Sequence, residues 1–136
     1  MPRNICFHSF RGGTGKTTLV ANLGVALARL GMRVGIVDFD LKSPAMQLLM
    51  RISSDDIRWK LNDYLWRRCN AKDVVLDISE RFGLIEGALF FVPASLNFDD
   101  IVKIIEDGYE ASLFSRFVNA IADDFNLDCL LLDTHS

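Results

Sequence analysis

Apolar residues follow two patterns along the chain, short continuous runs and longer stretches with helical spacing. The continuous runs predict buried strands at residues 5–7, 33–37, 88–94 and 127–133. Apolar residues spaced three or four positions apart predict helices at residues 16–30, 45–50, 60–66, 98–106 and 109–125. Strands that alternate with helices favour an α/β fold with a mainly parallel sheet, because a helical crossover returns the chain in the same direction.

The first apolar run leads into a glycine-rich loop and then directly into a helical pattern. Residues 5–18 read Ile-Cys-Phe-His-Ser-Phe-Arg-Gly-Gly-Thr-Gly-Lys-Thr-Thr. Glycines allow successive backbone N–H groups to point at phosphate oxygens, and the helix N-terminus adds its positive dipole at the same place. We therefore expect a phosphate-binding loop made of Gly12, Gly13, Thr14, Gly15, Lys16, Thr17 and Thr18. The alternative is an ordinary glycine-rich turn between a strand and a helix.

In such a loop, Lys16 would neutralise the β- and γ-phosphates and the Thr17 hydroxyl would bind Mg²⁺. Acidic residues stand where two other predicted strands end. Asp38 and Asp40 follow the second strand, and Asp133 closes the last one. An Asp that closes an apolar strand after a phosphate loop has the Walker B pattern, in which the carboxylate meets Mg²⁺, usually through water.

The two acids that follow the second strand, Asp38 and Asp40, have two possible interpretations. Parallel sheets bind ligands at the carboxyl ends of their strands, which favours a role for Asp38 and Asp40 at the phosphate site. Alternatively, they are solvated loop acids, or they cap a helix that Pro44 opens.

Composition restricts the kind of protein further. The chain has 136 residues, half of them hydrophobic, which suits one domain over residues 1–136. A net charge of −3 argues against a protein that coats nucleic acids. The three cysteines include no CxxC pair, so we expect free thiols, buried for Cys6 and Cys129, and no zinc or iron–sulfur site. The lack of a signal sequence or long apolar run predicts a soluble, cytoplasmic protein.

Residues 45–69 contain both basic and aromatic side chains. Acidic residues interleave with the basic ones, which favours a solvated helical face over a nucleic-acid-binding patch. For Trp59, Tyr64 and Trp66 we expect packing in the core, with a groove for a partner as the alternative, rather than a platform on which bases stack.

The loop resembles the deviant Walker A loop of the MinD/ParA family, whose pattern is Lys-Gly-Gly-x-Gly-Lys-Thr. Arg11 stands at the position of the first family lysine, which reaches across a nucleotide-sandwich dimer to the partner's phosphates. Guanidinium keeps the charge but is larger and planar, so the replacement puts dimer-coupled hydrolysis in question. Residues 38–40, 61–65, 92–95 and 131–135 also resemble the MinD-like branch, so the resemblance covers essentially the whole chain.

The resemblance implies a P-loop NTPase fold, a doubly wound and mainly parallel sheet with helices on both faces. The chain looks like its N-terminal part, with about four strands, and the edge of the first strand would be unpaired. The implied cofactors are ATP and Mg²⁺. Asp38 would lie near the magnesium shell and Asp40 would position the attacking water. The implied catalytic residues are Lys16, Asp40 and Arg11, and the implied metal-binding residues are Thr17, Asp38 and Asp133.

The implied function is an ATPase switch that dimerises with ATP and positions or partitions a plasmid, a chromosome locus or the division-site machinery. Its partners would be ATP and ADP, a second copy of the chain, and an activator or cargo-adaptor protein. Contact with DNA or membrane would come through the family's C-terminal part, which would place the full-length protein in the cytoplasm, at the membrane or on the nucleoid. Two alternatives stay open. One is a nucleotide-binding scaffold or regulator with little turnover, and the other is a related P-loop metabolic ligase or metal-cluster assembly enzyme.

Overall fold

The computed structural model describes residues 3–7 and 15–134 of the chain. The strands are β1 (Arg3–Phe7), β2 (Arg33–Phe39), β3 (Leu76–Asp77), β4 (Ala88–Val92) and β5 (Cys129–Thr134). The α-helices are α1 (Lys16–Arg29), α2 (Met46–Leu49), α3 (Leu61–Leu65), α4 (Phe98–Asp107) and α5 (Ala111–Asp124). Three short 3₁₀-helices, η1 (Ser54–Asp56), η2 (Ala71–Val74) and η3 (Ser79–Phe82), lie between α2 and β4.

The strands form one sheet in the order β1-β5-β2-β4-β3. β1, β5, β2 and β4 are mutually parallel, and β3 is antiparallel to β4. The predicted four-stranded, mainly parallel sheet is therefore confirmed. The added strand β3 has only two residues, which is too short to produce an alternating pattern in the sequence. Within the described residues β1 pairs with β5 alone, so its other edge is open there.

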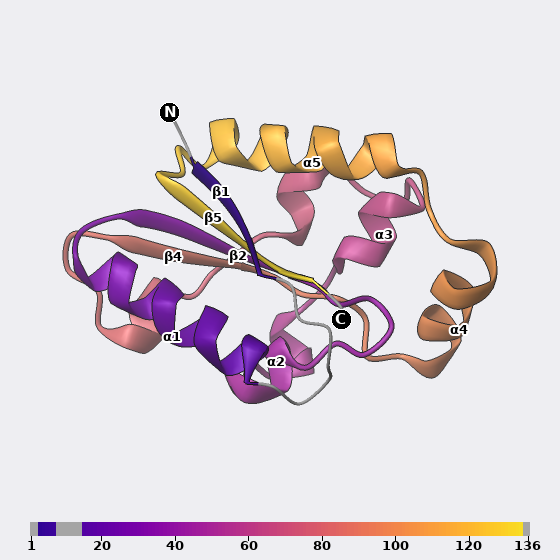
Figure 1. Cartoon of the computed structure of the whole chain (residues 1–136), viewed down its shortest axis with the longest axis horizontal. Helices are drawn as coiled ribbons and strands as arrows, with labels where there is room; N and C mark the ends of the chain where they lie inside the picture. Colours follow the sequence, from indigo (N-terminus) through magenta and orange to yellow (C-terminus); the bar gives the residue numbers. More distant parts are fainter. Residues whose placement is uncertain (1–2, 8–14, 135–136) are drawn as a thin grey trace.

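Helices cover both faces of the sheet (Figure 1). Alternate residues of the central strands point to opposite faces, and each set belongs to its own core cluster. Leu130 and Phe90 pack on the face of α5, with Phe117, whereas Leu131 and Ile36 pack on the face of α1, with Val20. The layered architecture implied by the resemblance is thus present.

Helix α1 approaches the sheet closely. A Cβ atom at Gly24 would lie 2.5 Å from Cδ1 of Ile36, so the missing side chain lets the helix pack onto β2. On the other face, the boundary between α4 and α5 falls at Gly108, whose φ is 67°. A positive φ suits glycine, and Gly108 ends the preceding helix.

The predicted aromatic and cysteine environments are largely confirmed. Trp59, Tyr64 and Trp66 are partly buried against the α5-face core. Cys129 is a buried free thiol, and Cys69 is free and half-buried. Burial, with the charges of Asp63 and Asp73, raises the pKa of Cys69 to about 11. The side chain of Cys6 lies outside the described residues. No helix in the described part of the chain is both long and apolar enough to span a membrane.

Candidate functional site

The candidate site lies where β5 and β2 end and α1 begins. Asp133 of β5 is the register partner of Asp38 of β2, so the two carboxylates stand side by side at the carboxyl edge of the sheet. Helix α1 starts after Gly15, which has φ 83° and therefore adopts the left-handed conformation that glycine tolerates best. Gly15 offers no side chain to cap this 14-residue helix, so among the described residues its first N–H groups carry no side-chain cap and suit an anion.

Asp133 receives two side chains from the first turn of α1. The Thr17 hydroxyl donates a hydrogen bond of 2.9 Å to Oδ2 of Asp133, and Nζ of Lys16 lies 3.4 Å from Oδ1. Asp133 is only 1% exposed, and its Oδ1 has no hydrogen bond to any described residue. The Lys16 ammonium gives this oxygen a positive charge nearby, and a bound water or metal ion would supply the direct contact that it lacks.

Asp38 is fully buried and is held by backbone groups. Its Oδ1 accepts from the N–H of Asp40 and its Oδ2 accepts from the N–H of Met46, each at 3.3 Å. Burial, and then the negative charge of Asp133, raise the pKa of Asp38 from 3.8 to about 7. Asp38 thus combines both interpretations from the sequence, since it faces Asp133 and also holds the first residue of α2.

Asp40 comes directly after β2 and is half-buried. The N–H of Ser43 donates to its carbonyl oxygen at 3.2 Å, which turns the chain away from the sheet edge. Thr18, in contrast, is exposed on α1 and lines a small groove of about 240 Å³ with Leu49 and Phe82. The structure therefore brings together four predicted site residues, Lys16, Thr17, Asp38 and Asp133. Four other predicted residues, Arg11, Gly12, Gly13 and Thr14, lie outside the described residues.

The donor set at Asp133 fits Mg²⁺. Thr17 and Asp133 offer oxygen atoms only, which is what this ion prefers. No group of three His, Cys, Asp or Glu side chains in the described ranges could hold a metal alone. Mg²⁺ commonly keeps several waters and takes one or two protein ligands together with substrate phosphates. A metal at Thr17 and Asp133 would therefore be completed by the ligand that it accompanies.

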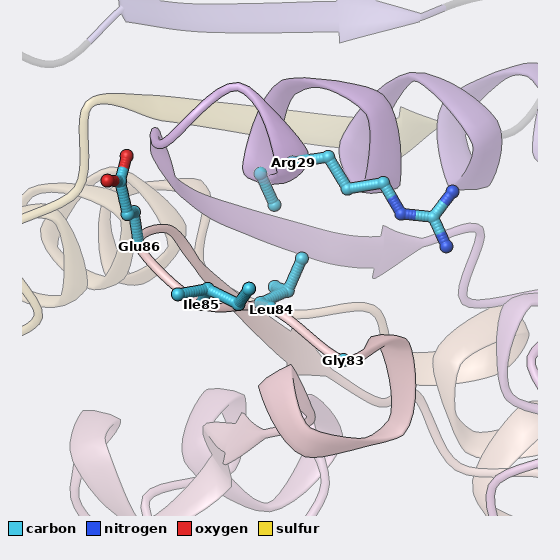
Figure 2. A pocket seen from close by; sticks show the side chains of 6 residues that line it. Arg29, Gly83, Leu84, Ile85 and Glu86 are labelled. Carbon is cyan, nitrogen blue, oxygen red and sulfur yellow. The ribbon is translucent and has the colours of Figure 1, made fainter.

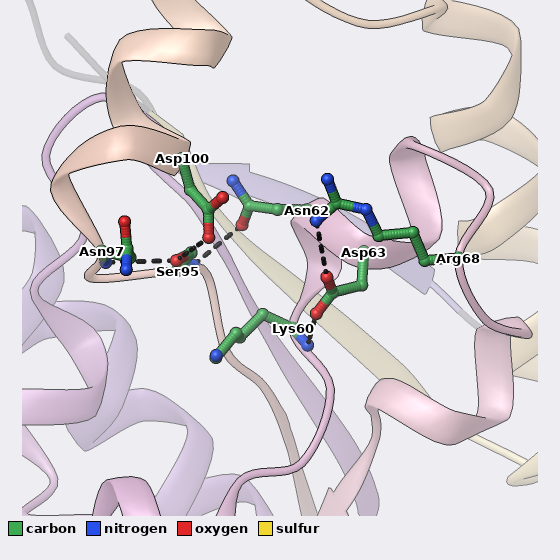
Figure 3. Close-up of polar contacts among 7 residues, drawn as sticks. All are labelled: Lys60, Asn62, Asp63, Arg68, Ser95, Asn97 and Asp100. Carbon is green, nitrogen blue, oxygen red and sulfur yellow. Dashed lines mark hydrogen bonds and ion pairs between the residues drawn. The ribbon is translucent and has the colours of Figure 1, made fainter.

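A polar contact after β4 joins two segments that the sequence singled out separately. The backbone N–H of Ser95 donates to Oδ1 of Asn62 at 2.8 Å, and the N–H of Leu61 donates to the carbonyl oxygen of Pro93 at 2.8 Å. The Ser95 hydroxyl then donates to Asp100 at 2.6 Å (Figure 3). Residues 61–65 are thus hydrogen-bonded to the segment that follows β4, residues 92–95. The sequence motifs marked these segments, but nothing in their spacing predicted that they touch.

A larger cavity, of about 390 Å³, lies at the opposite end of α1. Its lining includes Ala28, Arg29 and residues 83–86 (Figure 2). Figure 2 shows Arg29 and Glu86 extending in different directions, so their charges do not converge on the cavity. Since α1 spans about 20 Å at 1.5 Å per residue, this cavity is remote from Lys16 and Thr17. It is not part of the candidate site.

Comparison with known proteins identifies the chain's relatives. Residues 5–133 match the family model described as the CobQ/CobB/MinD/ParA nucleotide binding domain. The antiactivator FleN of Pseudomonas aeruginosa is 34% identical over 124 residues, which cover 91% of this chain and 39% of FleN.

Two solved structures are similar over nearly the whole chain. The septum site-determining protein MinD of Pyrococcus horikoshii, complexed with Mg-ADP, has a TM-score of 0.78 and 26% identity over 98% of this chain and 49% of MinD. The MinC:MinD cell division complex of Aquifex aeolicus gives a TM-score of 0.76 and 25% identity over 98% of this chain and 47% of the matched chain. The chain spans about half the length of these relatives or less.

Proposed function

The chain belongs to the CobQ/CobB/MinD/ParA family of nucleotide-binding domains, and from this membership we propose that it acts as a Mg²⁺-ATP-dependent ATPase switch. The observation that supports this most directly is the buried Asp133 carboxylate, which already holds the Thr17 hydroxyl and faces the Lys16 amine. A family member solved with Mg-ADP supports the choice of nucleotide and metal.

Each residue of the site has a proposed task in binding. Lys16 neutralises the β- and γ-phosphates, and its flexible amine can turn from Asp133 toward a phosphate oxygen. Thr17 and Asp133 hold Mg²⁺, with Asp38 close by, and the open N-terminus of α1 accepts phosphate oxygens together with the backbone of residues 12–18. Bound Mg²⁺ supplies positive charge against the developing charge of the phosphoryl group.

On this proposal, hydrolysis depends on the correct placement of the attacking water and does not need a strong base. Asp40 orients the attacking water, and a carboxylate with an ordinary pKa can do so. Arg11, which lies outside the described residues, would add positive charge to the phosphates of a partner copy.

The switch segment is residues 38–44. Asp38 links the site to α2 through the Met46 N–H, so a change at the phosphates can reach that helix. ATP favours a homodimer, and hydrolysis releases it. In the cell the switch would position or partition cargo together with an activator or adaptor protein, and the MinC:MinD complex of a relative supports a protein partner.

ATP binding and steady-state hydrolysis in Asp40→Ala test the proposal. We expect Mg²⁺-ATP binding to persist while kcat falls by roughly 100-fold or more, the size of effect typical of lost general-base or positioning groups. Asp55→Ala is the matched control, because Asp55 is exposed on η1, away from the site. Tight ATP binding without turnover in the wild type would overturn the ATPase and favour a scaffold or regulator. In that case, turnover restored by Arg11→Lys would assign the defect to Arg11.

A further inference from the structure

Phe39 stands between the two acids of the switch segment, and its ring is anchored on the opposite layer of the fold. It stacks on Phe114 of α5 with 3.8 Å between ring centroids and an interplanar angle of 8°. Tyr109, which precedes α5, meets the same ring edge-on at 5.8 Å. Successive strand residues point to opposite faces, so Phe39 packs on the α5 face while Asp38 lies on the face of α1.

The backbone around Phe39 has further contacts, among them the register pairing of Phe39 with Thr134 of β5. The N–H of Asp40 bonds to Asp38 at 3.3 Å and the N–H of Ser43 bonds to the Asp40 carbonyl at 3.2 Å. Both distances lie at the long end of the hydrogen-bond range. Ends of strands open more readily than their centres. The aromatic stack adds a side-chain restraint from the α5 layer to the residue that immediately precedes Asp40.

We propose that Phe39 is a positioning residue for Asp40, and that its stack with Phe114 fixes the end of β2 from which the Asp40 carboxylate extends. This inference rests on the proposed role of Asp40 in hydrolysis. A carboxylate that must orient one water loses effect when its backbone shifts, and a displacement of about 1 Å can cost about 100-fold in rate. We expect the stack to act on kcat, since Lys16, Thr17 and Asp133, which we propose bind phosphate and Mg²⁺, sit on α1 and β5.

The chain offers a matched control for simple core packing. Phe125, directly after α5, packs on Phe90 with ring centroids 5.1 Å apart, and it belongs to the same core cluster as Phe39. Phe125→Leu removes an aromatic contact of the same core without touching residues 38–44. Phe39→Tyr keeps a ring that can stack on Phe114, so it serves as the conservative variant.

The experiment measures kcat, KM for ATP, the Kd of Mg²⁺-ATP and the melting temperature for Phe39→Leu, Phe39→Tyr and Phe125→Leu. We expect Phe39→Leu to lower kcat by about 10- to 100-fold with KM and Kd unchanged. Phe39→Tyr should keep the wild-type kcat, and Phe125→Leu should lower only the melting temperature. If Phe39→Leu does not fold, Phe114→Leu removes the same stack from the helix side. It should likewise lower kcat while KM and Kd stay unchanged.

The double variant with Leu at both Phe39 and Phe114 shows whether the two rings act through their shared contact or independently. If Phe39 acts through Phe114, the double Leu variant should lose no more kcat than Phe39→Leu alone. Wild-type kcat in Phe39→Leu would overturn the inference, as would an equal loss of kcat in Phe125→Leu or a joint loss of Mg²⁺-ATP binding. A wild-type protein that binds ATP without hydrolysing it would instead refute the proposed function itself.

Discussion

At the scale of single residues, Asp133 connects the first turn of α1 to the carboxyl edge of the sheet. Its two oxygens differ, because Oδ2 accepts the Thr17 hydroxyl whereas Oδ1 faces Lys16 without a hydrogen bond. A buried oxygen of this kind is stable only with a charge or a ligand close by. Its environment is therefore suited to a metal ion and the phosphates that come with it.

The role of Thr17 can be separated from phosphate binding by removing the metal. We expect Thr17→Ala to weaken ATP binding by about tenfold or more in Mg²⁺, equivalent to about 1.4 kcal/mol. Its effect should vanish in EDTA, because the hydroxyl is proposed to bind the metal and not the phosphate. Titration calorimetry in both buffers measures this, with Thr17→Ser as the control that retains the hydroxyl. An equal loss in both buffers would contradict the assignment.

Asp38 should make the stability of the nucleotide-free protein depend on pH. Its pKa rises from 3.8 to about 7 on folding, so the folded state holds the proton more tightly than the unfolded chain. The contribution of Asp38 to the free energy of unfolding therefore falls as pH rises between these two values. It is lost completely above the pKa that Asp38 has in the folded protein. In Asp38→Asn this dependence is absent. The variant should gain stability over the wild type, by up to a few kcal/mol, as pH rises toward 8.

Urea denaturation of the wild type and Asp38→Asn at a series of pH values measures this difference. The two curves should converge near pH 4, where Asp38 is protonated in the folded protein. Asn can still accept a hydrogen bond from the Met46 N–H through its amide oxygen, so the fold of α2 is retained. Parallel stability curves across the whole pH range would contradict the account.

At the scale of elements, the position of the site depends on how α1 packs against the sheet. The end of α1 meets the residue before β4, where a Cβ at Gly87 would collide with the carbonyl oxygen of Ala28. Both groups are backbone, so neither can turn aside as a side chain would. This close contact helps to fix the direction of α1 and, through it, the place of its first turn.

Gly87→Ala should therefore destabilise the fold by about 1–3 kcal/mol, as overpacking usually does. Urea denaturation measures the change. The matched control is Gly83→Asn, because Gly83 has φ 61° with no atom within 4 Å of a built Cβ, and Asn tolerates that conformation. The control should cost less than Gly87→Ala. If Gly87→Ala were as stable as the wild type, α1 and β4 would not be in the contact that the structure shows.

The sequence predicted the elements well because most of them carry a regular apolar pattern. The helices α1 and α4 and the strands β2 and β4 begin within a residue of their predicted positions. The short α2 and α3 also begin within a residue of their predicted positions, whereas the two-residue β3 is too short to carry a pattern of its own. The predicted helix 109–125 is slightly shorter in the structure, where α5 runs from Ala111 to Asp124.

The site was predictable in its parts but not in its contacts. Parallel strands place their carboxyl ends together, so Asp38 and Asp133 were expected at one edge, near Lys16 and Thr17. Their meeting is confirmed, whereas their roles stay predictions. The stack of Phe39 on Phe114 and the bond of Ser95 to Asn62 could not be predicted. Each joins residues far apart in sequence, and such contacts depend on register and packing rather than on local pattern.

At the scale of the whole molecule, the fold places the edge that carries the candidate site between two helical layers. The α1 layer supplies Lys16 and Thr17, and the α5 layer supplies the aromatic anchor of Phe39. The sheet joins these layers through β5 and β2 (Figure 1). A change at the nucleotide can therefore affect both faces, which is what a switch that signals to a partner requires.

We propose that Mg²⁺-ATP controls the association of this protein with a second copy. The most direct test is its molar mass by light scattering, in ATP with and without Mg²⁺, for the wild type and Asp40→Ala. We predict that Mg²⁺-ATP doubles the mass of both, that the wild type returns to the monomer as ATP is consumed, and that Asp40→Ala stays dimeric. A mass that does not change with Mg²⁺-ATP, in a protein that binds it tightly, would contradict the account.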